Sequence, residues 1–68
     1  MASLNEVMPT DEPLLGHMIR VAQEVAGREN VDGRGYRIVV NTGREAGQSV
    51  SHVHLHLLAG KRMQWPPG

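Results

Sequence analysis

The feature that most constrains this chain is a strict alternation of histidine and apolar residues in its last third. The seven residues are His52-Val53-His54-Leu55-His56-Leu57-Leu58. Because a β-strand points successive side chains to opposite faces, an extended segment here places three imidazoles on one face and three apolar side chains on the other. Apolar side chains pack against a core, whereas imidazoles without polar partners are costly to bury. The pattern therefore predicts a strand whose histidine face is functional.

The length of the chain limits how stable it can be alone. Its 68 residues form at most one small domain, and a domain of that size buries only about 60% of its unfolded surface. The chain contains no cysteine, so neither disulfides nor a thiolate zinc site can add stability. We therefore expect it to depend on a partner subunit, a bound metal or a further piece of the same domain.

Charge and hydropathy exclude several classes of partner. Seven basic and seven acidic side chains cancel, and no basic stripe predicts binding to nucleic acid or to an anionic membrane. No apolar run approaches the ~20 residues of a membrane-spanning helix, and the first residues do not resemble a signal peptide. The expected location is intracellular, in the cytoplasm and also in the nucleus.

A helix is predicted over about residues 11–27. Thr10 is a candidate N-cap, and Pro13 is tolerated in a first helical turn. Apolar residues then recur at spacings of three and four, at Leu14, Met18, Val21, Ala22 and Val25. Gly27 suits a left-handed position at the C-terminal end of the helix. His17 lies within this helix and is interpreted as a partly exposed surface residue.

The remaining segments predict an α+β fold of one long helix followed by an antiparallel β-hairpin. Residues 1–9 are interpreted as a lead-in without a clear hydrophobic period. Strands are expected at about residues 36–41 and 51–58 because both have strand composition. Residues 59–68 are interpreted as a tail, in which two prolines exclude a central strand.

The polar residues before the histidine strand are candidate ligand contacts. Asn41 ends the first predicted strand, where its amide can fix an imidazole or a ligand oxygen. Gly47, Gln48 and Ser49 can turn their main-chain N–H groups inward as an anion nest, with the Ser49 hydroxyl beside them. Such a turn is more often an ordinary loop, but its position just before three histidines favours phosphate binding. Trp65, near the end of the tail, suits docking onto a partner surface, with a disordered tail as the alternative.

The histidine face permits two kinds of chemistry. Imidazoles two residues apart can bind one metal ion, but a third at the next alternate position lies about 13 Å from the first along a strand. A metal-binding fragment using His52 and His54 would therefore need a further ligand, and the only other histidine is His17. In the second kind, a central imidazole attacks phosphorus and forms a nucleotidyl-histidine that water hydrolyses. Donors from the glycine-rich turn and Ser49 would then stabilise the developing charge.

The sequence resembles the histidine triad (HIT) family, whose signature is His-φ-His-φ-His-φ-φ with φ apolar. The segment from His52 to Leu58 matches that signature at all seven positions. Further segments are similar to the Hint branch, the nucleoside phosphoramidases: Leu14-Leu15-Gly16-His17, Gly35-Tyr36-Arg37, Val39-Val40-Asn41, Gly47-Gln48-Ser49-Val50 and Trp65-Pro66-Pro67-Gly68. The resemblance covers about residues 10–68, which look like the C-terminal half of the family's domain. Ser51 departs from the branch, which often has an aromatic residue there.

The resemblance implies a role for each polar residue of the site. His54 would be the nucleophile that takes up the nucleoside monophosphate, and His56 would contact the phosphate and help to align the ring. His52 would orient His54 and relay a proton. Ser49 would bond the phosphate or the leaving nitrogen, and Asn41 would bind near the ribose and phosphate.

The resemblance also implies substrates and partners. Members hydrolyse purine nucleoside phosphoramidates, including adenylated lysine, and need neither a metal nor another cofactor. They are homodimers with a sheet continued across the interface, and the C-terminal tail, here with Trp65, reaches towards the partner's site. The expected partners are thus a purine nucleoside monophosphate or phosphoramidate, and a second subunit or the missing half-domain. The alternative is a truncated, non-catalytic module for nucleotide binding or protein interaction.

Overall fold

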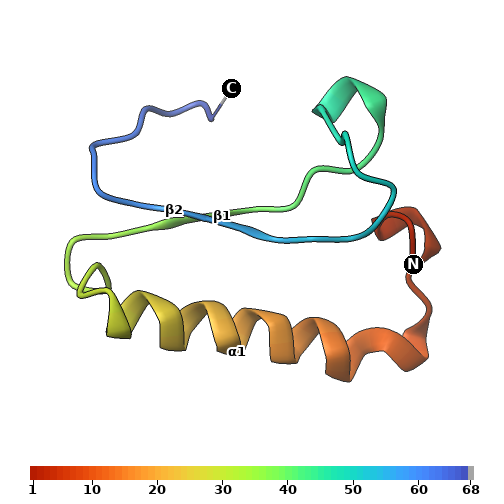
Figure 1. Cartoon of the computed structure of the whole chain (residues 1–68), viewed down its shortest axis with the longest axis horizontal. Helices are drawn as coiled ribbons and strands as arrows, with labels where there is room; N and C mark the ends of the chain where they lie inside the picture. The colour runs from red at the N-terminus through yellow and green to blue at the C-terminus, as the bar shows by residue number, and fades with distance from the viewer. Residues whose placement is uncertain (68) are drawn as a thin grey trace.

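The computed structural model describes residues 1–67, in which one helix lies beside a two-stranded antiparallel ribbon (Figure 1). In chain order the elements are the 3-10 turns Leu4–Glu6 and Pro9–Asp11, helix α1 (Glu12–Arg28), strand β1 (Arg37–Val39), the 3-10 turn Arg44–Ala46 and strand β2 (His56–Leu58). The predicted α+β class is confirmed, as is the order of one long helix followed by antiparallel strands. Gly68, the last residue of the predicted tail, lies outside the described residues.

The start of helix α1 differs from the predicted cap. Pro13 does lie in the first turn, where its missing N–H costs no helical hydrogen bond. Thr10, however, lies inside the preceding 3-10 turn, and the N-cap residue is Asp11. The carboxylate of Asp11 does not cap the helix but accepts a hydrogen bond of 2.9 Å from the main-chain N–H of Met8. The prediction of a Thr10 cap is therefore wrong, because the turn before the helix takes up that residue.

The end of helix α1 is also displaced from the prediction. Gly27 lies within the helix, which continues to Arg28. The residue in the left-handed conformation is Asn30, with φ of 59°. Asn tolerates this conformation better than most residues because its short polar side chain bonds locally. The left-handed position predicted for Gly27 is therefore three residues too early.

Both strands are shorter than the predicted ranges of 36–41 and 51–58. The ladder pairs Arg37 with Leu58, Ile38 with Leu57 and Val39 with His56, and then stops. Beyond it, the N–H of Val53 donates to the main-chain oxygen of Met1 at 3.0 Å. The first part of the histidine segment thus bonds to the N-terminal residues instead of extending the ladder with β1.

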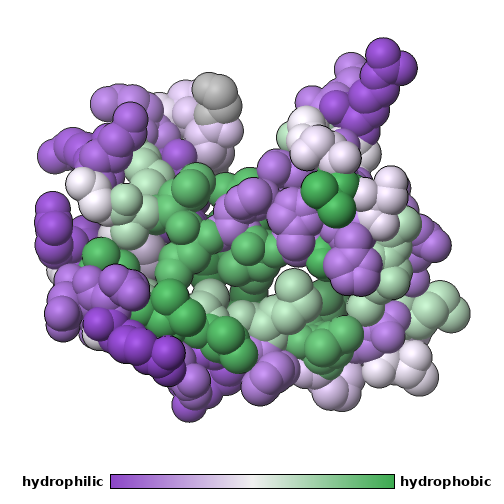
Figure 2. Space-filling model, in the orientation of Figure 1, coloured by the Kyte–Doolittle hydropathy of each residue, from purple (hydrophilic) through white to green (hydrophobic). Residues whose placement is uncertain are grey.

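The layer between α1 and the strands is thinly packed. Among the described residues, only Ala22 and Ala26 are buried hydrophobic side chains. Apolar side chains of α1 stay exposed, among them Leu14, Ile19 and Val21. Figure 2 shows hydrophobic residues gathered around a hollow in this face of the molecule. The small core agrees with the sequence-based expectation that the chain depends on something further for its stability.

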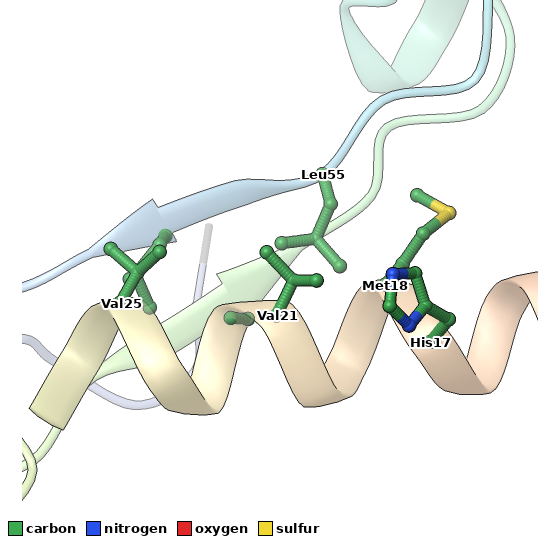
Figure 3. Close-up of a pocket in the computed structure, with 7 residues that line it drawn as sticks. His17, Met18, Val21, Val25 and Leu55 are labelled. Carbon is green, nitrogen blue, oxygen red and sulfur yellow. The ribbon is translucent and has the colours of Figure 1, made fainter.

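An open cavity of about 370 Å³ lies between α1 and the histidine segment. Its lining residues are almost all apolar: His17, Met18, Val21, Ala22, Val25, Leu55 and Leu57. Figure 3 shows Leu55 pointing towards the helix and Val21 and Val25 pointing towards the strands.

No helix within residues 1–67 is both long and apolar enough to cross a membrane.

Candidate functional site

The three histidines lie where the chain enters strand β2. His56 is the first residue of β2, and His52 and His54 belong to the extended segment before it. The rings of His54 and His56 meet edge to face, with centroids 4.8 Å apart and planes at 72°. His54 is half-buried, whereas His52 and His56 are exposed. The structure therefore brings the rings of His54 and His56 together, and His54 is the most buried of the three histidines.

A main-chain contact fixes the orientation of the central ring. Nδ1 of His54 lies 2.8 Å from the main-chain oxygen of His52. A carbonyl oxygen can only accept a hydrogen bond, so Nδ1 must carry the proton. In the neutral ring the lone pair then belongs to Nε2. His52 thus orients His54 through its carbonyl group, a contact that the side-chain pattern of the sequence does not reveal.

The opposite side of this segment faces the helix. Leu55 and Leu57 line the cavity beside α1, while His56 between them is exposed, so the predicted alternation is present here. His17 is an exposed residue of α1 and lines the same cavity as the two leucines. Within residues 1–67, no group of three histidine, aspartate or glutamate side chains is close enough to hold a metal ion.

The loop before the histidines is closed by its own hydrogen bonds. Gly43 and Gly47 have φ of 84° and 85° and flank the turn Arg44–Ala46. The N–H of Gly47 donates to the oxygen of Arg44 at 3.0 Å, and the N–H of Gln48 donates to the oxygen of Gly43 at 3.1 Å. Two of the N–H groups expected to face an anion are therefore engaged within the loop. Ser49, the next residue, is exposed, so it stays a predicted ligand contact.

Asn41 and Thr42 follow strand β1 and lead into the loop. Asn41 lies two residues past Val39, where the ladder with β2 ends. Asn41 is half-buried. The Thr42 hydroxyl oxygen is buried and has no hydrogen-bond partner within residues 1–67. The sequence did not single out Thr42 because a threonine after a strand is an ordinary turn residue, whereas a buried hydroxyl without a partner is unusual.

A side chain of strand β1 holds the C-terminal tail at Gln64. Nη2 of Arg37 donates to the main-chain oxygen of Gln64 at 2.8 Å. Trp65 follows immediately and is 84% exposed. The ring is therefore held near the start of β1 but contacts little of its own chain, so its surface remains open to a partner.

A family model for the HIT domain matches residues 1–63. The chain belongs to the HIT family. The match includes the loop and all three histidines, and it also includes residues 1–9, which the sequence alone did not relate to the domain.

Similar proteins support this assignment. HIT-like proteins of Synechocystis sp. and Synechococcus elongatus, both described as uncharacterized, are 44% and 43% identical to the chain over all of its 68 residues. The crystal structure of a HIT family hydrolase from Legionella pneumophila covers the whole chain with a TM-score of 0.97 and 43% identity. A histidine triad protein from Clostridium difficile covers 94% of the chain with a TM-score of 0.88 and 31% identity.

The relatives are longer than this chain. The chain spans 59% of each of the two curated relatives, and 61% and 56% of the two solved structures. The fold described here is therefore a fragment of the HIT fold, and it contains the histidine motif.

Proposed function

We propose that this chain carries the catalytic segment of a HIT-type hydrolase that cleaves purine nucleoside phosphoramidates, such as adenylated amines or lysine. The observation that supports the proposal most is the contact between Nδ1 of His54 and the oxygen of His52, 2.8 Å long. It leaves the Nε2 lone pair of a half-buried ring available for attack. Membership of a family whose solved members include a named hydrolase supports the same reaction class.

The proposed reaction has two displacements at phosphorus. Nε2 of His54 attacks the phosphorus and forms a P–N bond to the ring, while the P–N bond of the substrate breaks. The leaving nitrogen takes up a proton and departs as an amine. Water then attacks the phosphorus of the nucleotidyl-histidine, which releases the nucleoside monophosphate and restores the neutral ring.

The neighbouring polar residues have proposed roles around this step. His56, whose ring meets that of His54 at 4.8 Å, would contact the phosphoryl oxygens and stabilise the charge that develops there. The imidazole of His52 would relay a proton to the leaving nitrogen, and the exposed Ser49 hydroxyl would bond that nitrogen or the phosphate. Asn41 would bind near the ribose and phosphate.

The proposal includes a partner. The chain covers about three fifths of its relatives, and an apolar cavity of about 370 Å³ is open beside α1. A homodimer, or association with the remainder of a HIT domain, would cover this surface, and Trp65 would reach a partner's site. A cytoplasmic location belongs to the same proposal.

The thin core favours a second candidate function. Because only Ala22 and Ala26 are buried hydrophobic residues in the part of the chain that the structure describes, a substrate bound at the histidines would lack the support that a larger domain gives. The chain could then bind a purine nucleotide or a partner protein without turnover. A melting temperature raised by purine monophosphate in a chain without hydrolysis would favour this candidate over the first.

Turnover of an adenosine phosphoramidate by matched histidine variants tests the proposal. His54→Ala should abolish release of AMP, and Ser49→Ala should reduce it by roughly tenfold or more, as loss of a donor to the reacting group does. His17→Ala is the matched control, because His17 lies on α1 beside the cavity, and it should retain activity. Equal turnover by wild type and His54→Ala, with melting curves that show both to be folded, would contradict the proposal.

A further inference from the structure

Both ends of the Gln48 side-chain amide form hydrogen bonds within the chain. Its Oε1 accepts a hydrogen bond from the N–H of Gly43 at 2.8 Å. Its Nε2 donates to the main-chain oxygens of Ala2 at 2.6 Å and Val50 at 3.1 Å. A glutamine amide has two donors, and both are used here. No side-chain donor of Gln48 remains for a phosphate.

These contacts join three parts of the molecule. Gly43 begins the loop and Val50 ends it, so the Gln48 amide closes the loop across its base. The bond to Ala2 ties that loop to the first residues, which lie beside it in Figure 1. The neighbouring oxygen of Met1 accepts from the N–H of Val53 at 3.0 Å. Gln48 is thus linked to Val53, which lies between His52 and His54. The link runs from the Gln48 side chain to Ala2, along the main chain to Met1, and from Met1 to Val53.

We propose that Gln48 is a positioning residue, which holds the loop and residues 1–2 against the histidine segment so that Ser49 and His54 keep their relative places. The inference rests on the proposed hydrolase function, and it gives the Gln48 side chain a part separate from the main-chain anion nest expected of this loop. It matters for the reaction because a displacement of about 1 Å at a reacting group can cost up to about 100-fold in rate.

Amide hydrogen exchange of the free protein tests the contacts without any need for turnover. In Gln48→Ala, exchange at Gly43 and Val53 should rise by roughly tenfold, the effect of losing an ordinary hydrogen bond, while amides of α1 keep their rates. Gln48→Glu keeps an acceptor for Gly43 but removes both donors, so exchange should rise at Val53 and stay low at Gly43. Gln23→Ala is the matched control, because the Gln23 amide accepts from Arg20 on the exposed face of α1. Unchanged exchange at Val53 in both Gln48 variants would overturn the proposal.

Kinetics separate positioning from direct binding. Gln48→Ala should lower kcat for an adenosine phosphoramidate by about tenfold or more and change KM by less than about twofold, whereas loss of a ground-state phosphate contact would raise KM with kcat retained. The second pattern would overturn the proposal.

If the wild-type chain shows no turnover, the hydrolase function fails on its own. The decisive readout is then hydrogen exchange at Val53, which should rise in both Gln48 variants, and unchanged exchange there would overturn positioning.

Discussion

Nδ1 of His54 lies 2.8 Å from the main-chain oxygen of His52, two residues earlier in the chain. The contact is local, since it spans one residue of an extended segment, and it sets which nitrogen of the central ring carries the proton. It also explains why the histidine spacing matters. The same alternation that puts the imidazoles on one face brings the carbonyl group of one histidine to the ring of the next.

The tautomer of His54 is the first prediction. In its neutral form the ring should be protonated at Nδ1, because a carbonyl partner accepts and cannot donate. Long-range proton–nitrogen NMR spectra, recorded at a pH where the imidazoles are neutral, distinguish the two ring nitrogens. His17, which has no such partner among residues 1–67, serves as the internal reference. A dominant Nε2–H form of His54 would show that the contact is absent in solution.

Replacing either of two alanines of α1 by leucine should change the stability of the fold, in opposite directions at the two positions. Ala26 is fully buried, so Ala26→Leu forces the packing and should destabilise the fold by about 1–3 kcal/mol. Ala22 lines the open cavity, so Ala22→Leu fills space and should stabilise by about 0.5–2 kcal/mol. Thermal melts of the two variants compare them directly. A lower Tm for Ala22→Leu than for Ala26→Leu would mean that the cavity is closed in solution.

Replacing either of two glycines by alanine should also change the stability in opposite directions. Gly27 lies inside α1 with open space where a Cβ would be, and Gly27→Ala should stabilise the helix by up to about 1 kcal/mol. Gly35 also has open space, but its φ is 103°, a conformation that alanine adopts only with strain. Gly35→Ala should therefore lower the Tm while Gly27→Ala raises it. Equal shifts for both would show that the backbone at Gly35 differs from the one described.

The attachment of the tail is a further prediction. Arg37 holds the tail through the oxygen of Gln64, next to the only tryptophan of the chain. Arg37→Ala should free Trp65 and lower its fluorescence anisotropy. Arg44→Ala, in the loop, removes the same charge elsewhere and should leave the anisotropy unchanged. The same anisotropy in Arg37→Ala and wild type would exclude a role for Arg37 in fixing the tail.

Much of the fold could be predicted because its signals are local and periodic. The apolar spacing in α1 and the alternation around His56 each determine which face of an element packs, so the class and the order of elements followed from the sequence. The exact ends of the helix and strands could not be predicted in this way. Thr10 is a good cap in isolation, but the turn Pro9–Asp11 occupies it, and the left-handed residue is Asn30 and not Gly27. Such choices depend on neighbours a few residues away that compete for the same hydrogen bonds.

The sequence proposes which residues form the candidate site, but it does not reveal the contacts between them. The histidine motif proposes His52, His54 and His56, and the structure places the rings of His54 and His56 together. The contacts of the first two residues could not be predicted, because Met1 and Ala2 accept hydrogen bonds through their main-chain oxygens, which every residue has. The same is true of the His52 carbonyl group. Contacts of this kind depend on where the main chain runs and are invisible to residue identity.

The most direct measurement of the central claim is the intact mass of the protein after brief incubation with an adenosine phosphoramidate. The account predicts a mass increase of one adenylate in the wild-type chain, or its turnover product AMP, and neither in His54→Ala. His17→Ala should behave as wild type. A folded wild-type sample that gives neither adduct nor AMP would contradict catalysis by this chain, and an adduct that persists in His54→Ala would contradict His54 as the nucleophile.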